Sequence, residues 1–145
     1  MKPSLLVADE PISALDVSIQ AQVINILKEL RNNYELSILL IAHDLRMVHY
    51  VCDRIAVIKN GRIVEIGTAD EVFYHSIHPY TKSLVSAVPS INNIGQEIKP
   101  ISYNPLMHNY DEENKPEWHQ ITPTHQVLGT LQELKKWTLK ESREQ

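Results

Sequence analysis

The chain has 145 residues, of which 43% are hydrophobic, and this is enough for one globular domain with its own core. Its single cysteine, Cys52, excludes an internal disulfide framework and an iron–sulfur cluster ligated by this chain alone. The net charge of −4 argues against a nucleic-acid-binding surface. No apolar run approaches the ~18–20 residues that span a bilayer, and no signal peptide is visible, so we expect a soluble, cytoplasmic protein.

Strand and helix patterns alternate over the first 67 residues. Leu5–Ala8 and Ser37–Ala42 are short apolar runs, which are typical of strands buried on both faces of a parallel sheet. Between them, apolar residues recur at helical spacing from about Val17 to Asn33, and Asp16 stands where an N-cap belongs. The order strand–helix–strand predicts an α/β fold with a right-handed crossover.

Local signals predict four further elements before residue 89. Asp44 is expected to cap a short helix that ends near Val51. Asn60-Gly61 lies between two apolar runs and predicts a hairpin, because both central residues of such a turn need positive φ. Thr68 and Glu71 form a capping box that opens a helix, and a further helix is expected from Tyr80 to Val88.

The composition changes at Pro89. Five of the eight prolines lie between Pro89 and Thr124, with little hydrophobic periodicity, which predicts a long irregular tail. Residues 126–143 are expected to regain helix. We interpret Trp118 and Trp137 as anchors of this tail rather than as a ligand stack.

Two carboxylates follow the first predicted strand. Asp9 and Glu10 come at its carboxyl end, which is the edge of the sheet where ligands bind in α/β folds. The first carboxylate can hold Mg²⁺, usually through water, and the second can orient or deprotonate a nucleophilic water. Taken alone, the same pattern also fits a strand end with solvated acids. The residues that follow decide between the two interpretations.

The pattern Asp-Glu-Pro-x-Ser-x-Leu-Asp, then a helix and an apolar strand that ends in His-Asp, resembles the second half of an ABC-type ATPase. These motifs correspond to Walker B, the D-loop and the switch histidine. The resemblance implies that Asp9 is the Mg²⁺-site carboxylate, that Glu10 is the catalytic base and that His43 contacts the γ-phosphate. It also implies that Ser13 and Asp16 belong to the nucleotide-binding D-loop, at the interface between two paired domains.

Two later segments narrow the resemblance to one group of ABC proteins. Asn60–Thr68, followed by Glu71-Val72-Phe73, looks like the part that follows the switch in ABC importers. His78–Leu84 begins with His-Pro-Tyr and resembles the C-terminal region of oligopeptide and dipeptide importer ATPases. The resemblance covers residues 3–89, with one departure at His75-Ser76, where that family commonly has Asn-Pro. His75 and His78 also have the spacing of half a metal site, but we interpret them as a loop and a turn histidine.

The resemblance implies a fold and a division of the chain. We expect an α/β fold: a partial P-loop NTPase (ABC-type) core with parallel strands, a C-terminal hairpin and a largely irregular tail. Residues 1–67 would be the C-terminal part of the ATPase core, residues 68–89 the importer-type C-terminal helices, and residues 90–145 a proline-rich tail with a terminal helix.

The sequence has no phosphate cradle of the P-loop kind. None of its four glycines is followed by lysine and no two are adjacent, so both Gly-x-x-x-x-Gly-Lys-Ser/Thr and a Gly-Gly signature loop are absent. The glutamine loop that contacts a permease would also lie upstream. We therefore interpret the chain as the C-terminal part of a longer ATPase with very poor ATP affinity of its own. Its sheet is then expected to expose an apolar edge and face.

Two functions remain open. The resemblance implies an ATP-binding and ATP-hydrolysing subunit of an ABC importer for oligopeptides, which uses ATP and Mg²⁺. It would pair with a second ABC ATPase subunit and dock on permease subunits at the inner face of the cell membrane, with a peptide-binding protein as an indirect partner. The alternative is a non-catalytic fragment that at most binds its partner ATPase. An ABC-type ATPase of DNA repair is disfavoured by the negative charge and the His-Pro-Tyr segment, so no nucleic-acid partner is expected.

Overall fold

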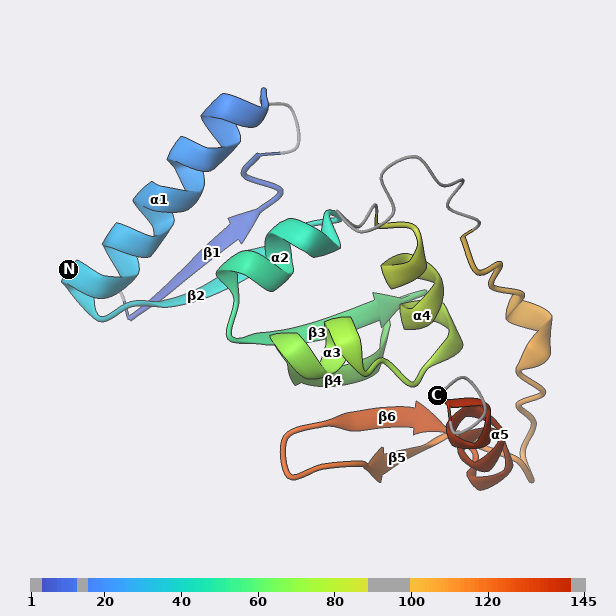
Figure 1. Cartoon of the computed structure of the whole chain (residues 1–145). Coiled ribbons are helices and arrows are strands. Elements are labelled where there is room, and N and C mark those ends of the chain that lie inside the picture. Colours follow the sequence, from blue (N-terminus) through green and yellow to red (C-terminus); the bar gives the residue numbers. More distant parts are fainter. Residues whose placement is uncertain (1–3, 13–15, 89–99, 142–145) are drawn as a thin grey trace. The chain divides into compact units, whose positions relative to one another are not determined.

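The computed structural model describes residues 4–12, 16–88 and 100–141 and divides the chain into two compact units, residues 1–52 and 53–145 (Figure 1). The expected segment boundaries after residues 67 and 89 differ from this division. The reason is that the hairpin assigned to the ATPase core pairs with strands from the C-terminal end of the chain. In the described part of the chain, no helix combines the length and the apolar character needed to cross a bilayer.

The first unit is a strand–helix–strand–helix arrangement, as expected. It contains β1 (Leu5–Asp9), α1 (Val17–Tyr34), β2 (Ser37–Ile41) and α2 (Leu45–Val51). Strands β1 and β2 pair in parallel, from Leu5 opposite Ser37 to Asp9 opposite Ile41. The parallel pairing and the helix between the strands confirm the α/β prediction.

Helix α1 is held by its backbone at both ends. The amides of Ile19 and Gln20 donate to the carbonyl of the N-cap residue Asp16, whose carboxylate makes no capping bond. At the other end Glu35 adopts a left-handed conformation and donates to the carbonyl of Arg31. The core of this unit is formed by three buried side chains and by partly buried neighbours on β2, α1 and α2: Ile12, Ile24 and Met47, with Val23, Leu40, Ala42, Val48 and Val51.

One face of the two-stranded sheet is exposed, so the expectation that both strands are buried on two faces is wrong. Leu5, Val7, Leu39 and Ile41 are each 47–55% exposed, whereas Leu6, Ala8, Ile38 and Leu40 on the other face are partly buried. The cause is that the helices α1 and α2 cover a single face. The exposed apolar face agrees with the expectation, drawn from the missing motifs, that this sheet exposes such a face.

The second unit is built on a four-stranded antiparallel sheet in the order β3-β4-β6-β5. Three helices and a short 3₁₀ turn accompany this sheet in the described residues. The elements are β3 (Arg54–Lys59), β4 (Arg62–Thr68), α3 (Ala69–Tyr74), α4 (Pro79–Ser86), the 3₁₀ turn Pro105–Met107, β5 (Glu117–Gln120), β6 (Gln126–Gly129) and α5 (Leu131–Glu141).

The predicted turn and cap of this unit are confirmed. Asn60 and Gly61 have φ values of 49° and 75°, so both adopt the left-handed conformation that joins β3 to β4 in a two-residue hairpin. At the start of α3 the Thr68 hydroxyl accepts from the Glu71 amide at 3.2 Å, and the Glu71 carboxylate accepts from the Thr68 amide at 2.8 Å. This reciprocal pair is a complete capping box.

The C-terminal region is more regular than the proline content predicts. Residues 117–120 and 126–129 form the strands β5 and β6, and β6 adds to β4 through Glu65–Val127 and Ile66–Gln126 (Figure 1). The helix expected over 126–143 begins only at Leu131. Four-residue strands carry too few alternations to be recognised, and the partner of β6 is sixty residues away in sequence.

Only one of the two tryptophans anchors this region. Trp137 is 5% exposed and packs with Ile77 and Val127 in a second core, whereas Trp118 is 47% exposed. Gly129 permits the close approach of the Trp137 ring, because a Cβ atom at residue 129 would lie 2.7 Å from it.

Candidate functional site

The carboxyl ends of β1 and β2 bring two of the predicted site residues together. The Nδ1 atom of His43 lies 3.2 Å from the Oε1 atom of Glu10, although the residues are 33 positions apart in sequence. Both side chains are open to solvent, with 72% of His43 and 49% of Glu10 exposed. Asp9 is the last residue of β1, directly precedes Glu10 in the chain and is also exposed.

The backbone at Glu10 has an unusual conformation. Its φ is 43°, in the left-handed region that non-glycine residues seldom adopt. The Glu10 amide donates to the carbonyl of Ile41 at 2.8 Å, and the buried side chain of Ile12 fixes the chain two residues later. A conformation of this kind persists where the surroundings determine it, and it is concentrated at functional sites.

A small hollow adjoins the pair. Its volume is about 60 Å³ and its lining comes from the strand ends, α1 and α2: Glu10, Ile12, Gln20, Ala42, His43, Asp44 and Met47. Pockets for small-molecule ligands are usually ~300–1,000 Å³. The hollow therefore has room for ordered water beside Glu10 and His43, and not for a nucleoside triphosphate.

The structure describes only one of the two predicted D-loop residues. Asp16 is the exposed N-cap residue of α1, and its carboxylate is not used to cap that helix. Ser13 lies outside the described residues. The structure thus joins Glu10 to His43, sets Asp9 beside Glu10 and puts Asp16 at the helix start that follows. The roles of these residues stay predictions.

One carboxylate from the protein is enough to hold Mg²⁺ in a site where water and substrate phosphates supply the other ligands. Within residues 4–12, 16–88 and 100–141, no three His, Cys, Asp or Glu side chains converge to hold a metal ion. Mg²⁺ usually keeps several waters and takes one or two carboxylates together with substrate phosphates. The exposed oxygen atoms of Asp9 are compatible with that demand.

Asp44 positions the helix that follows His43. Its Oδ1 atom accepts from the amides of Arg46 at 3.0 Å and Met47 at 3.2 Å, as an N-cap should. We expect Asp44→Ala to destabilise α2 by about 1 kcal/mol and Asp44→Ser to retain most of that stability, because serine also caps well. Hydrogen exchange of the α2 amides measures the difference, and equal exchange in both variants would contradict the capping role.

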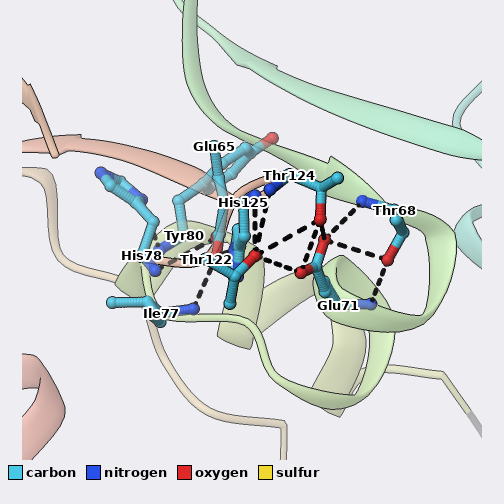
Figure 2. Close-up of polar contacts among 9 residues, drawn as sticks. All are labelled: Glu65, Thr68, Glu71, Ile77, His78, Tyr80, Thr122, Thr124 and His125. Atoms are coloured by element: carbon cyan, nitrogen blue, oxygen red, sulfur yellow. Dashed lines mark hydrogen bonds and ion pairs between the residues drawn. The ribbon is translucent and has the colours of Figure 1, made fainter. Parts of the chain in front are cut away.

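A second polar cluster lies in the other unit, where Glu65 on β4 is fully buried (Figure 2). Its carboxylate accepts from the amides of Ile77 at 2.7 Å and His78 at 3.1 Å and contacts the Nε2 atom of His125 at 2.8 Å. One side chain therefore joins β4 to the segment before α4 and to the residue before β6. Sequence reasoning missed it, although a glutamate within the apolar run Ile63–Ile66 was an available signal.

The Glu71 carboxylate accepts hydrogen bonds from three threonines (Figure 2). Besides Thr68, it accepts from the hydroxyls of Thr122 and Thr124. The hydrogen bond from Thr122, followed by that from the Thr68 backbone, lowers the pKa of Glu71 to about 2. These bonds fasten the loop between β5 and β6 to the start of α3.

The lowered pKa gives Glu71 a pH-dependent contribution to folding. Its folded pKa lies below the usual value of 4.5, so the stabilisation is present above pH 4.5 and is lost as the pH falls from 4.5 towards 2. We expect Glu71→Gln to lower the free energy of unfolding by roughly 1 kcal/mol at pH 7 and to flatten its pH dependence in that window. Urea unfolding of both proteins at several pH values measures this. If the free energies of unfolding of the two proteins change in parallel with pH, Glu71 does not make this contribution.

Comparison with known proteins finds a matching family model and several similar sequences. Residues 64–120 match the family model described as "Oligopeptide/dipeptide transporter, C-terminal region". The chain is 50% identical, over 97% of its length, to the oligopeptide transport ATP-binding protein OppF of Streptococcus mutans, and it covers 45% of that protein. It is 50% identical, over 90% of its length, to the dipeptide transport ATP-binding protein DppF of Lactococcus lactis, of which it covers 41%. For OppF of Bacillus subtilis the identity is 44% over 94% of this chain and 45% of the relative.

Among solved structures, cbiO1 of Clostridium perfringens, described as part of the ABC transporter complex cbiONQ, is 32% identical over 50% of this chain and 29% of its own. The TM-score is 0.47, so the family assignment rests on the sequence relatives. Those relatives are ATP-binding proteins of transport systems, which is the class that the strand-end carboxylates and His43 predict. Over nearly its whole length the chain is similar to oligopeptide and dipeptide transport ATP-binding proteins, and it spans slightly less than half the length of the curated relatives it matches.

Proposed function

We propose that this chain is the water-activating part of an ATP-binding and ATP-hydrolysing subunit of an ABC importer for oligopeptides. The observation that carries the proposal is the 3.2 Å contact between Glu10 and His43 at the carboxyl ends of β1 and β2. The similarity to oligopeptide and dipeptide transport ATP-binding proteins supports the choice of ATP as substrate and of peptides as cargo.

In this proposal Glu10 is the general base. With Nδ1 facing Glu10, the His43 imidazole donates to that carboxylate before a nucleotide is bound. A terminal phosphate oxygen that competes for the imidazole releases the carboxylate, which can then accept a proton from the attacking water. His43 thereby links the presence of the γ-phosphate to the readiness of the base. The hollow beside the pair has room for the attacking water.

Asp9 would hold Mg²⁺ through its carboxylate, mostly by way of water. When bound, the ion would neutralise charge on the phosphates of ATP. Ser13 and Asp16 would face a second ABC ATPase subunit. The assembled protein would lie in the cytoplasm on the inner face of the membrane, bound to permease subunits, with a peptide-binding protein as an indirect partner.

The phosphate-binding loop would come from sequence outside these 145 residues. Two observations support this: none of the four glycines is followed by lysine, and the hollow beside Glu10 is much smaller than a nucleotide pocket. The test is to co-express the chain with the part of S. mutans OppF that it does not match; we call this pair the complemented ATPase. We expect ATP hydrolysis by the pair and none by the chain alone.

The exposed face of Leu5, Val7, Leu39 and Ile41 favours a second candidate, a non-catalytic fragment that at most binds a partner ATPase. A complex that forms without hydrolysing ATP would support this alternative and contradict the first proposal. Hydrolysis that appears only in the pair would support the first proposal and contradict the alternative.

A further inference from the structure

Two histidines stack in the second unit, and neither is among the residues of the candidate ATP site. The rings of His78 and His108 are 5.2 Å apart and inclined by only 17°. His78 is 2% exposed, and the side chain of His108 is 8% exposed. The edge of Trp137, on α5, packs against both rings at 5.2 and 5.9 Å. The stack therefore joins the start of α4 to the segment 101–110 and to α5.

The hydrogen bond of the His78 ring requires its uncharged form, and the His108 ring has one nitrogen atom bonded and one without a partner. The Nδ1 atom of His78 accepts from the Tyr80 amide at 3.1 Å, which caps α4, and this atom must carry no proton. The Nδ1 atom of His108 lies 2.7 Å from the Glu133 carboxylate, to which it can donate. The Nε2 atom of His108 is buried and has no hydrogen-bond partner, so a proton there would lack an acceptor.

We propose that the His78–His108 stack is an acid-sensitive latch, which holds residues 101–110 and helix α5 against α4 while the His78 ring is uncharged. A proton on His78 takes the lone pair that caps α4. A charged His78 ring would also lie buried against the His108 and Trp137 rings, where its contacts supply no acceptor for the new proton.

The charged and titratable groups around the latch come from each element that packs on it. Glu133 on α5 faces His108, and the Tyr110 hydroxyl lies 3.0 Å from the His108 Nδ1 atom. The ring of Tyr103 is 6.3 Å from His78 and 5.7 Å from His108. Tyr80 follows His78 on α4 and meets Tyr103, and Lys59 on β3 lies over both tyrosine rings. Glu65 on β4 contacts His78 only through the backbone amide.

Burial, followed by the nearby His108, lowers the pKa of His78 to about 4 from its usual 6.5. Because the folded value lies below the unfolded one, the contribution of His78 to stability is present above pH 6.5. It is lost as the pH falls from 6.5 towards 4. The latch is therefore closed at neutral pH and opens in this acidic range.

The fluorescence of Trp137 tests the latch directly in a Trp118→Phe background, since Trp118 is half exposed and the chain has two tryptophans. Between pH 6.5 and 4 we expect acrylamide to gain access to Trp137 before the amides of the β3–β4 hairpin exchange. His78→Asn keeps an N-cap acceptor without a titrating ring and should move this transition to lower pH. His75→Asn, at an exposed histidine three residues earlier, should leave it unchanged.

Two outcomes overturn the proposal: a His78→Asn protein that follows the same pH course as its parent, or Trp137 that stays shielded until the hairpin opens. If His78→Asn does not fold, the ring signals of the parent decide by NMR. A His78 ring that gains its proton without any change at Trp137 would also contradict the latch.

Discussion

Glutamine in place of Glu10 is expected to slow ATP hydrolysis by the complemented ATPase by roughly 10²–10⁴-fold, the usual contribution of a general base. The amide keeps the shape of the side chain and can still contact His43, but it cannot take a proton from water. We expect the variant to bind ATP normally, because Glu10 would act on the attacking water and not on the phosphates. Turnover and nucleotide affinity, measured on the same preparation, separate the two effects.

Glu29→Gln is the matched control for this prediction. Glu29 is an exposed residue in the middle of α1, so the same chemical change there should leave turnover unaltered. A Glu10→Gln protein that hydrolyses ATP within a few-fold of its parent would show that Glu10 is not the base. The contact with His43 would then be an exposed ion pair of little consequence.

Replacing Glu65 with leucine is expected to lower the free energy of unfolding of the second unit by about 3–5 kcal/mol, because each buried polar group left without a partner costs about 1–3 kcal/mol. The substitution leaves the buried amides of Ile77 and His78 without an acceptor and the His125 ring without its partner. A loss of this size is a large part of the ~5–15 kcal/mol that stabilises a typical domain. Urea unfolding followed by Trp137 fluorescence measures it.

Glu117→Leu, on the edge strand β5, supplies the control for Glu65, because Glu117 is exposed. It should change stability by less than about 0.5 kcal/mol. If Glu65→Leu unfolds at the same urea concentration as Glu117→Leu, the carboxylate of Glu65 does not hold the β4, α4 and β6 regions together. Glu65→Gln should be intermediate, since an amide oxygen can still accept from one backbone N–H group.

The sequence predicts most of the first unit because its signals are local. The apolar runs around Val7 and Leu39, the N-cap position of Asp16 and the cap at Asp44 each appear within a few residues of the element that they specify. The proximity of Glu10 and His43 also follows from the sequence, since the carboxyl ends of adjacent parallel strands meet at one edge of a sheet. The apolar runs alone predicted burial on both faces, and the exposed sheet face was expected only from the missing motifs, because burial depends on how many layers cover the strands.

The second unit is harder to predict because its contacts are distant in sequence. The capping box at Thr68 and the turn at Asn60-Gly61 are local and were predicted correctly. The pairing of β6 with β4 depends instead on Glu65 and Val127, which lie in separate segments and carry no shared pattern. The stack of His78 on His108 is also hard to predict from the sequence. A histidine side chain is polar, and it becomes part of a core only when a segment distant in sequence covers it.

The most direct test of the account is a calorimetric titration of Mg-ATP into the chain alone and into the complemented ATPase. In the proposed site, Asp9, Glu10 and His43 act on metal, water and the terminal phosphate, while the loop that binds the other phosphates comes from sequence outside these 145 residues. We therefore predict micromolar binding by the complemented ATPase and none in that range by the chain alone. Micromolar binding of Mg-ATP by the chain alone would contradict this division of the ATP site.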